Sequence, residues 1–259
     1  LIIGSTLRKD HPLIAQRLRQ AAKNGLQLNI INPIDDDLLV KVANKAIVAP
    51  SSMVKALAEI LKAAVEIKGN NQPEEIQHLV GLTNASNTAS AFGMASSLME
   101  HSPAAIYLGN LSQHHPEYSR IKLLSGLLAQ VTGASFGILG EAANSVGAHW
   151  AGAIPYVSGF KTAIQSNHEM IGMNAAQMLG FGKDNTDSSC RAFILMNVEP
   201  EFDTYNSQQA MQAMHSSELV ISMSIYKGNA ESYADVLLPI APFSETSGTY
   251  VNTEGRVQS

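Results

Sequence analysis

Cysteine is almost absent from this sequence. Cys190 is the single cysteine among its 259 residues, so no disulfide can form within the chain. One thiol also falls short of the four thiolates that typically hold an iron–sulfur cluster. A cluster bound by cysteines of this chain alone is therefore excluded.

Charged residues and long apolar runs are scarce as well. Charged residues make up 15% of the chain and the formal net charge is −5, whereas nucleic-acid binding needs clustered Lys and Arg. No apolar run approaches the roughly 20 residues that a membrane-spanning helix needs. Nucleic acid is therefore excluded as a partner, and any membrane association is expected to come through partner proteins.

The usual nucleotide-binding and metal-binding patterns are missing too. The sequence has no G-x-G-x-x-G fingerprint and no P-loop lysine motif. His114 and His115 are adjacent in a loop, without an Asp, a Cys or a further His at ligand spacing. We therefore predict no catalytic residue and no metal site, and we assign both histidines a structural or surface role.

What the sequence does contain is a regular alternation of short apolar runs and amphipathic segments. Strands are expected at residues 1–3, 28–31, 46–48, 104–108, 136–139, 192–196, 219–224 and 236–238. Helices are expected at about residues 12–23, 54–67, 85–99, 116–131, 169–179 and 207–214. This alternation predicts an α/β fold with doubly wound, mostly parallel sheets, arranged as two Rossmann-like subdomains.

The segment 68–76 is the expected boundary between the subdomains, because it is rich in Gly, Asn, Gln and Pro. It separates a partial first subdomain, 1–67, from a truncated second one, 77–259. Residues 148–166 lack periodicity and are expected to form a long surface loop. The chain starts without Met, and residues 252–259 are expected to complete no helix or strand, so we interpret both ends as cuts.

Several expected strands end in short turns of glycine and polar residues. Two of these turns, Gly4-Ser5-Thr6 and Gly109-Asn110, follow the first strand and the strand at 104–108. In parallel sheets, ligands bind at the carboxyl ends of strands, where glycine lets the backbone approach a phosphate. Turns also use Gly and Asn for conformational reasons alone. The residues Gly4, Ser5, Gly109 and Asn110 are therefore candidates for a cofactor pocket, and a purely structural role stays open.

The segment Ser232–Gln258 resembles a signature of the molybdopterin oxidoreductase superfamily. It reads A-D-V-L-L-P at 234–239, followed by E-T-S-G-T-Y-V-N-T-E-G-R at 245–256. The N-terminal Gly4-Ser5-Thr6 with His11-Pro12 is similar to the G-S-N … H-P element of that superfamily. The stretches 109–116 and 141–148 more closely resemble the superfamily-like region in the iron–sulfur subunit of bacterial NADH-quinone oxidoreductase, which is respiratory complex I.

The resemblance to this iron–sulfur subunit implies a domain that has lost an ancestral molybdenum cofactor. In that family the iron–sulfur clusters lie in a region before this one, and electrons pass from NADH to quinone with ion translocation. The resemblance therefore implies a cofactor-free scaffold that is catalytically silent by itself. Its expected partners are the other subunits of the peripheral arm, on the cytoplasmic face of the bacterial inner membrane.

Two other interpretations stay open at this point. In a true molybdenum or tungsten oxidoreductase such as formate dehydrogenase, Asn252 and the four turn residues of the candidate pocket would touch the pterin dinucleotide. An unrelated nucleotide-binding or interaction module on the same scaffold is the third possibility, because one fold serves many functions. The sequence upstream of Leu1 would separate the first two interpretations.

Overall fold

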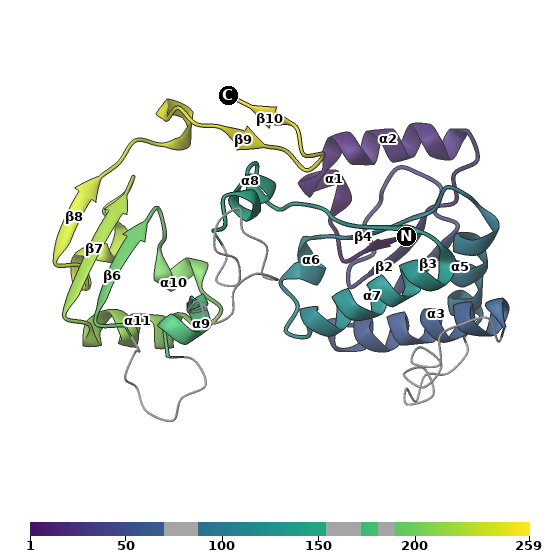
Figure 1. Cartoon of the computed structure of the whole chain (residues 1–259), viewed down its shortest axis with the longest axis horizontal. Coiled ribbons are helices and arrows are strands. Elements are labelled where there is room, and N and C mark those ends of the chain that lie inside the picture. Colours follow the sequence, from purple (N-terminus) through teal and green to yellow (C-terminus); the bar gives the residue numbers. More distant parts are fainter. Residues whose placement is uncertain (70–87, 154–171, 181–189) are drawn as a thin grey trace, which may run out of the picture. The chain divides into compact units, whose positions relative to one another are not determined.

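The computed structural model describes residues 1–69, 88–153, 172–180 and 190–259. It divides into two compact units, Leu1–Ala142 and Ala143–Ser259 (Figure 1). Each unit has a parallel sheet of its own.

The first unit is built on a five-stranded parallel sheet. Its strands are β1 Ile2–Ile3, β2 Asn29–Asn32, β3 Asn44–Ile47, β4 Ala105–Leu108 and β5 Ser135–Ile138. They lie in the order β3-β2-β1-β4-β5, and every neighbouring pair is parallel. The order of the strands reverses between β1 and β4, which is the topological switch point of a Rossmann-like sheet.

Helices connect these strands, and several of them begin or end at residues that favour a helix boundary. They are α1 Leu7–Asp10, α2 Pro12–Lys23, α3 Met53–Lys68, α5 Ala89–Glu100, α6 Asn110–Gln113 and α7 Tyr118–Thr132, with a 3-10 turn η1 at Pro50–Ser52. Pro12 opens α2, where its missing N–H costs no hydrogen bond. The side chain of Thr88 accepts the N–H of Ala91 to cap α5. Gly133 ends α7 in the left-handed region, at φ 75°.

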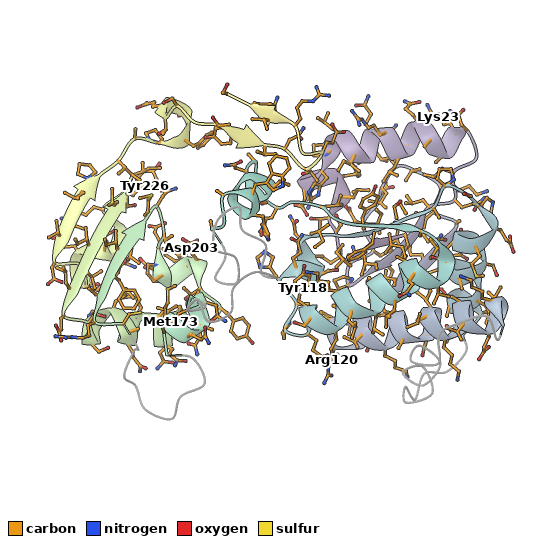
Figure 2. All side chains as sticks on the ribbon, in the orientation of Figure 1. Lys23, Tyr118, Arg120, Met173, Asp203 and Tyr226 are labelled. Atoms are coloured by element: carbon orange, nitrogen blue, oxygen red, sulfur yellow. The ribbon has the colours of Figure 1, made fainter. Side chains whose placement is uncertain are left out.

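Helices cover both faces of this sheet, as the figures show (Figures 1 and 2). Ile3 and Ile31 join a core cluster formed with α3, α5 and α7, whereas Ile2 and Ile30 belong to a second cluster that includes Ala15 of α2. Successive residues of a strand point to opposite faces. Because helices cover both faces, successive residues of a strand are buried on opposite sides of the sheet, and such strands need apolar residues at consecutive positions.

The second unit contains a smaller parallel sheet. Strands β6 Ala192–Met196, β7 Leu219–Ser224 and β8 Val236–Pro239 lie in that order. Its helical elements are α8 Ser145–Trp150, α9 Ala175–Met178, α10 Pro200–Asp203 and α11 Ser207–Ser216, with 3-10 turns η3 Gly228–Ser232 and η4 Phe243–Glu245. Leu195 and Val220 pack with Met214 of α11 in its core. An antiparallel pair, β9 Tyr250–Val251 and β10 Val257–Gln258, completes the unit.

The α/β fold with mostly parallel sheets is as predicted, but several details differ from the expectations. Along the chain, the first compact unit ends at Ala142 and the second begins at Ala143. Strands β4 and β5, which follow residues 68–76 in the sequence, belong to the first sheet, so the first unit is larger than the expected subdomain 1–67. Residues 70–76 of that expected boundary lie outside the described residues.

Two expectations for the second unit also differ from the structure. Part of the expected surface loop is helix α8, and residues 154–166 of that loop lie outside the described residues. The expectation that 252–259 completes no strand was wrong, because β10 pairs with β9 around a tight turn. Among the described residues, no helix has the length and apolar character needed to cross a membrane.

Candidate functional site

The turns after β1 and β4 meet at the topological switch point of the first unit. The N–H of Gly4 donates to the carbonyl of Ile31 at 2.8 Å, and the N–H of Gly109 donates to the carbonyl of Ile3 at 2.8 Å. These bonds continue the sheet pairing by one residue beyond each strand. Gly4, Ser5, Gly109 and Asn110 therefore come together at one edge, where parallel sheets of this order bind ligands.

Both glycines at this edge are required by close contacts. A Cβ on Gly109 would lie 2.3 Å from Cβ of Ser5 and 2.5 Å from the carbonyl oxygen of Gly4. A Cβ on Gly4, which has φ +61°, would lie 2.3 Å from Oγ of Ser112. Ser112 is fully buried, and its hydroxyl donates to the carbonyl of Ile3 at 2.7 Å. The two turns are thus packed directly against each other and against α6.

Two polar atoms at the switch point are buried without a hydrogen-bond partner in the described part of the chain. They are Oγ of Ser5, which is 5% exposed as a residue, and Oδ1 of Asn110. A buried polar atom without a partner typically costs about 1–3 kcal/mol. A polar ligand at this edge would supply the missing partners.

Side chains around the switch point fix the backbone that follows β5. Nε2 of His11 lies 2.9 Å from the carbonyl oxygen of Gly140, and Nε2 of Gln113 donates to the carbonyl of Leu139 at 2.8 Å. A carbonyl can only accept, so Nε2 of His11 carries the proton in this bond. Nε2 of His114 lies 2.7 Å from Oε2 of Glu141 on the surface.

His115 has a structural role, in agreement with the sequence-based assignment. Its Nε2 donates to the carbonyl of Pro50 at 2.9 Å, and its Nδ1 accepts the N–H of Glu117 at 2.9 Å. Both ring nitrogens are therefore used by the backbone. In the described residues, no group of three or more His, Cys, Asp or Glu side chains could hold a metal ion.

Asn252, the fifth candidate, lies in the second unit and is occupied by local bonds. Its Oδ1 accepts the N–H of Glu254 at 3.1 Å and the N–H of Arg256 at 2.9 Å. The N–H of Gly255, a residue with φ 80°, donates to the carbonyl of Asn252 at 2.9 Å. The string N-T-E-G-R therefore builds the turn between β9 and β10.

Asn144 is a residue that sequence reasoning named only as part of a motif. Its Oδ1 accepts the N–H of Val251 at 2.8 Å, and its Nδ2 donates to the carbonyl of Thr249 at 3.4 Å. A Cβ on Gly147 would lie 2.0 Å from that Oδ1. The loop before α8 and the strand β9 are thus joined by one side chain, and Gly147 leaves the space for it.

Two further motif residues act on the sheet of the second unit. Oδ2 of Asp235 accepts the N–H of Val220 at 2.8 Å, which fixes the start of β8 beside β7. The hydroxyl of Tyr233 donates to Oε2 of Glu201 at 3.3 Å. Burial, and next the nearby carboxylates of Glu201 and Glu199, raise the pKa of Tyr233. This phenol therefore stays protonated and serves as a hydrogen-bond donor.

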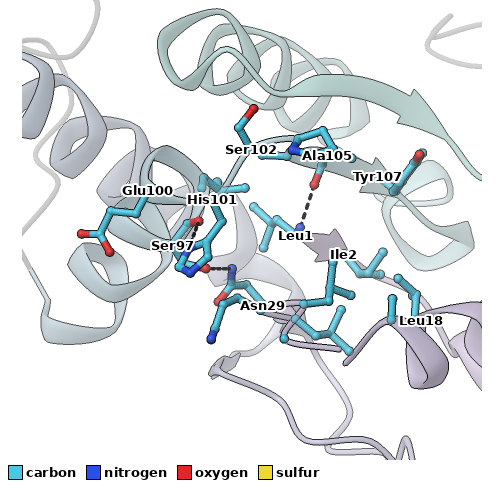
Figure 3. A pocket seen from close by; sticks show the side chains of 18 of the residues that line it. Leu1, Ile2, Leu18, Asn29, Ser97, Glu100, His101, Ser102, Ala105 and Tyr107 are labelled. Atoms are coloured by element: carbon cyan, nitrogen blue, oxygen red, sulfur yellow. Dashed lines mark hydrogen bonds between the residues drawn. The ribbon is translucent and has the colours of Figure 1, made fainter. Parts of the chain in front are cut away.

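A pocket of the first unit lies at the opposite, amino end of the strands (Figure 3). It has a volume of about 680 Å³. Two of its polar side chains are hydrogen-bonded to Ser97: Nδ2 of Asn29 donates to Oγ of Ser97 at 2.8 Å, and Nδ1 of His101 lies 3.1 Å from the backbone carbonyl oxygen of Ser97. Because ligands of parallel sheets bind at the carboxyl ends, the pocket does not coincide with the candidate site.

One string, Gly133-Ala134-Ser135-Phe136-Gly137, matches the letters G-x-S-x-G of a hydrolase nucleophile elbow. It lies at the end of α7 and leads into β5. A nucleophile elbow runs from a strand into a helix, with the serine on the strained turn between them. Ser135 instead begins a strand, so no nucleophile is assigned here.

Comparison with known proteins shows similarity along the whole chain to one group of redox enzymes. The chain is 24% identical to the F420-dependent formate dehydrogenase 1 subunit alpha of Methanococcus maripaludis, over 99% of this chain and 43% of that protein. It is 23% identical to the F420-dependent formate dehydrogenase subunit alpha of Methanocaldococcus jannaschii, over 100% of this chain and 43% of that protein. The chain thus spans less than half the length of these relatives.

Two other comparisons add a local match and a similar fold. Over 39 residues, or 14% of the chain, it is 54% identical to the NADH-ubiquinone oxidoreductase 78 kDa subunit of Candida albicans. The formyltransferase/hydrolase complex of Methylorubrum extorquens has a similar fold, with a TM-score of 0.58 and 17% identity over 99% of this chain and 67% of that chain.

The family model of molybdopterin oxidoreductase matches residues 1–259. This match extends over both compact units and includes the switch point, the loop at Asn144 and the turn at Asn252. The chain belongs to the molybdopterin oxidoreductase family.

Proposed function

We propose that this chain is the pterin-dinucleotide-binding region of a molybdenum- or tungsten-dependent oxidoreductase of the formate dehydrogenase type. One observation carries the proposal: Oγ of Ser5 and Oδ1 of Asn110 are buried without partners in the described residues, one on each side of the switch point. The similarity to formate dehydrogenase alpha subunits along 99–100% of the chain supports it.

The residues at the switch point have the chemistry that such a ligand requires. The Ser5 hydroxyl can donate to a phosphate or accept from a ring N–H. The side-chain carbonyl of Asn110 can accept from an amine or a ring N–H. Gly4 and Gly109 keep the strand ends close together, so that both side chains are presented at one edge. When bound, the metal and its pterin would supply the redox chemistry, and no catalytic residue is assigned to this chain.

The test is the cofactor content of the protein purified as the complete gene product. We expect about one molybdenum or tungsten atom and a pterin per chain by elemental analysis and by fluorescence of the oxidised pterin. The double variant Ser5→Ala with Asn110→Leu should lose most of the pterin. The control Ser125→Ala removes a buried hydroxyl within α7 that has no hydrogen-bond partner in the described part of the chain, and this variant should keep the pterin. A wild-type protein without metal and pterin contradicts the proposal.

A second candidate function is favoured by the local match of 54% identity to an NADH-ubiquinone oxidoreductase subunit. In this case the chain is part of the iron–sulfur subunit of an NADH-quinone oxidoreductase, and it serves as a cofactor-free scaffold. The clusters that carry electrons from NADH would lie elsewhere in the parent subunit. Its partners would be peripheral-arm subunits on the cytoplasmic face of the bacterial inner membrane.

The same preparation distinguishes the two functions. If the chain is part of an NADH-quinone oxidoreductase, the purified protein should contain iron and acid-labile sulfide but no molybdenum, tungsten or pterin. It should also co-purify with an NADH-oxidising partner. Reduction of a quinone by NADH in that complex would support the second function. Formate oxidation by a metal-loaded and pterin-loaded protein would support the first.

A further inference from the structure

One face of the three-stranded parallel sheet in the second unit is apolar and open. Six side chains form this open face, in two rows across the strands: Ile194, Ile221 and Val236, then Met196, Met223 and Leu238. Ile194 and Met196 are 69% and 66% exposed, and Val236 and Leu238 are 39% and 46% exposed. None of the six side chains is polar, so the two rows form one continuous apolar patch.

The opposite face of the same sheet is packed. Successive residues of a strand point to opposite faces, and Leu195 of β6 and Val220 of β7 belong to the core cluster of this unit. That cluster also contains Met214 of α11 and Ala230 of η3. Helix α11 lies in the connection from β6 to β7, and η3 lies in the connection from β7 to β8. Both connections therefore cover the same face.

The direction of the connections explains why the other face stays open. Crossovers between parallel strands are right-handed, so connections that run the same way along a sheet lie on the same face. In the first unit, α2 between β1 and β2 packs on one face, and α7 between β4 and β5 runs the other way and packs on the opposite face. In the second unit, the order β6-β7-β8 follows the chain. The described part of that unit thus has no connection in the reverse direction.

We propose that an amphipathic helix of the same polypeptide, from outside residues 1–259, packs on the open face. Parallel sheets are found almost entirely with both faces covered, because their strands are apolar on both sides. The helix belongs to a connection that runs in the reverse direction along this sheet. Its apolar side chains contact the two rows, and its polar side chains face away from the sheet.

The size of the open face fits one helix better than a second copy of the chain. Neighbouring strands lie about 4.8 Å apart, so the face is about 10 Å wide between β6 and β8. A helix with its side chains has a diameter of about 10–12 Å. A stable interface between two proteins instead uses about 20–30 residues on each partner, whereas six side chains form the open face.

The length of the relatives supports an occupant from the same polypeptide. The chain spans 43% of each of the two formate dehydrogenase subunits, so each relative has more sequence outside the matched part than inside it. That additional sequence is long enough to contain the helix. The inference does not depend on a bound pterin, since both proposed functions place the chain within a larger subunit, and its tests measure coverage rather than cofactor content.

Oxidative footprinting of the complete gene product measures whether the open face is covered. Met178, which is 38% exposed, is the exposed reference, and Met94, which is 0% exposed, is the buried reference. If a helix covers the face, Met196 should be oxidised to the sulfoxide at least about threefold more slowly than Met178 and should approach the rate of Met94. Any smaller protection of Met196 overturns the inference.

A photocrosslinker identifies the occupant. With p-benzoylphenylalanine in place of Met196 in the complete gene product, the captured peptide should come from outside residues 1–259, in a product of monomer mass. The same probe in place of Tyr205, which is 90% exposed and lies outside the three strands, is the matched control and should not capture that peptide. A crosslink to any segment within residues 1–259, including 154–171, or a product of dimer mass overturns the inference. Footprinting of the wild type remains decisive if the probe variant fails to fold.

Discussion

The side-chain carbonyl of Asn144 accepts a hydrogen bond from the backbone N–H of Val251 at 2.8 Å. The two residues are 107 positions apart, and each lies in a segment that resembles a family motif. The bond attaches β9 to the loop before α8, within the second unit. This hydrogen bond gives Asn144 and Val251 a role in folding that does not depend on the ligand of the parent protein.

Asn144→Ala is expected to destabilise the second unit by about 1–3 kcal/mol, because the N–H of Val251 loses its acceptor. Denaturant unfolding measures the loss, and hydrogen exchange should show faster exchange at Val251. Asn144→Asp keeps the acceptor for Val251 but loses the donor to the carbonyl of Thr249, so it should recover only part of the lost stability. Equal stability of wild type and Asn144→Ala would show that this bond does not hold β9.

Gly109→Ala is expected to be much more damaging than the loss of a single hydrogen bond. The added methyl group would lie 2.3 Å from Cβ of Ser5 and 2.5 Å from the carbonyl oxygen of Gly4. Because backbone and Cβ atoms cannot rotate away, we expect a loss of about 2–3 kcal/mol or more in the free energy of unfolding.

Gly126→Ala is the matched control for that substitution. Gly126 lies within α7, and a Cβ there would meet no atom within 4 Å. Replacing a helical glycine by alanine should raise stability by about 0.5–1 kcal/mol. If both variants were equally stable, the packing at the switch point would be looser than the distances indicate.

The repeated strand and helix pattern of the first unit was readable from the sequence, because most of its strands contain apolar residues and some of its helices have clear boundary residues. Pro12 and Gly133 mark a helix start and a helix end through backbone constraints that are local. The division into units was harder, because it depends on which strands pair. The pairing of β1 with β4 joins residues more than a hundred positions apart, and no local pattern encodes it.

The candidate site was predictable only in part. Glycine and polar residues after β1 and β4 indicated a shared edge, and the structure places Gly4, Ser5, Gly109 and Asn110 there. Asn252 was assigned by analogy, whereas its side chain forms a local turn in the second unit. Oδ1 of Asn32 and Oδ2 of Asp36 are also buried without a hydrogen-bond partner among the described residues, which depends on three-dimensional packing and leaves no signal in the sequence.

The ion pair between Arg191 and Glu218 should contribute little to stability despite its good geometry. Nε and Nη2 of Arg191 lie 2.6 and 2.7 Å from the two carboxylate oxygens. The side chains are 82% and 61% exposed, so water and salt screen the attraction. Arg191→Gln should change the midpoint of chemical unfolding only slightly, and less still in 1 M salt. A large loss of stability would indicate that the pair is buried by another part of the protein.

Asp235 should matter more than that exposed pair, although its side chain makes a single hydrogen bond to the described residues. Its Oδ2 accepts the N–H of Val220, and its own N–H donates to the carbonyl of Val220 at 2.9 Å, so both bonds align β8 with β7. Asp235→Ala removes the first bond and leaves a buried N–H unpaired, at a cost of about 1–3 kcal/mol.

Asp235→Asn separates this hydrogen bond from a simple effect of charge. The amide oxygen can still accept the N–H of Val220, so most of the stability should return although the negative charge is lost. Unfolding curves of the two variants, together with hydrogen exchange at Val220, measure the difference. If Asp235→Asn is as unstable as Asp235→Ala, the charge is required at this position. In that case the aspartate of the A-D-x-x-L-P motif would have a role beyond strand alignment.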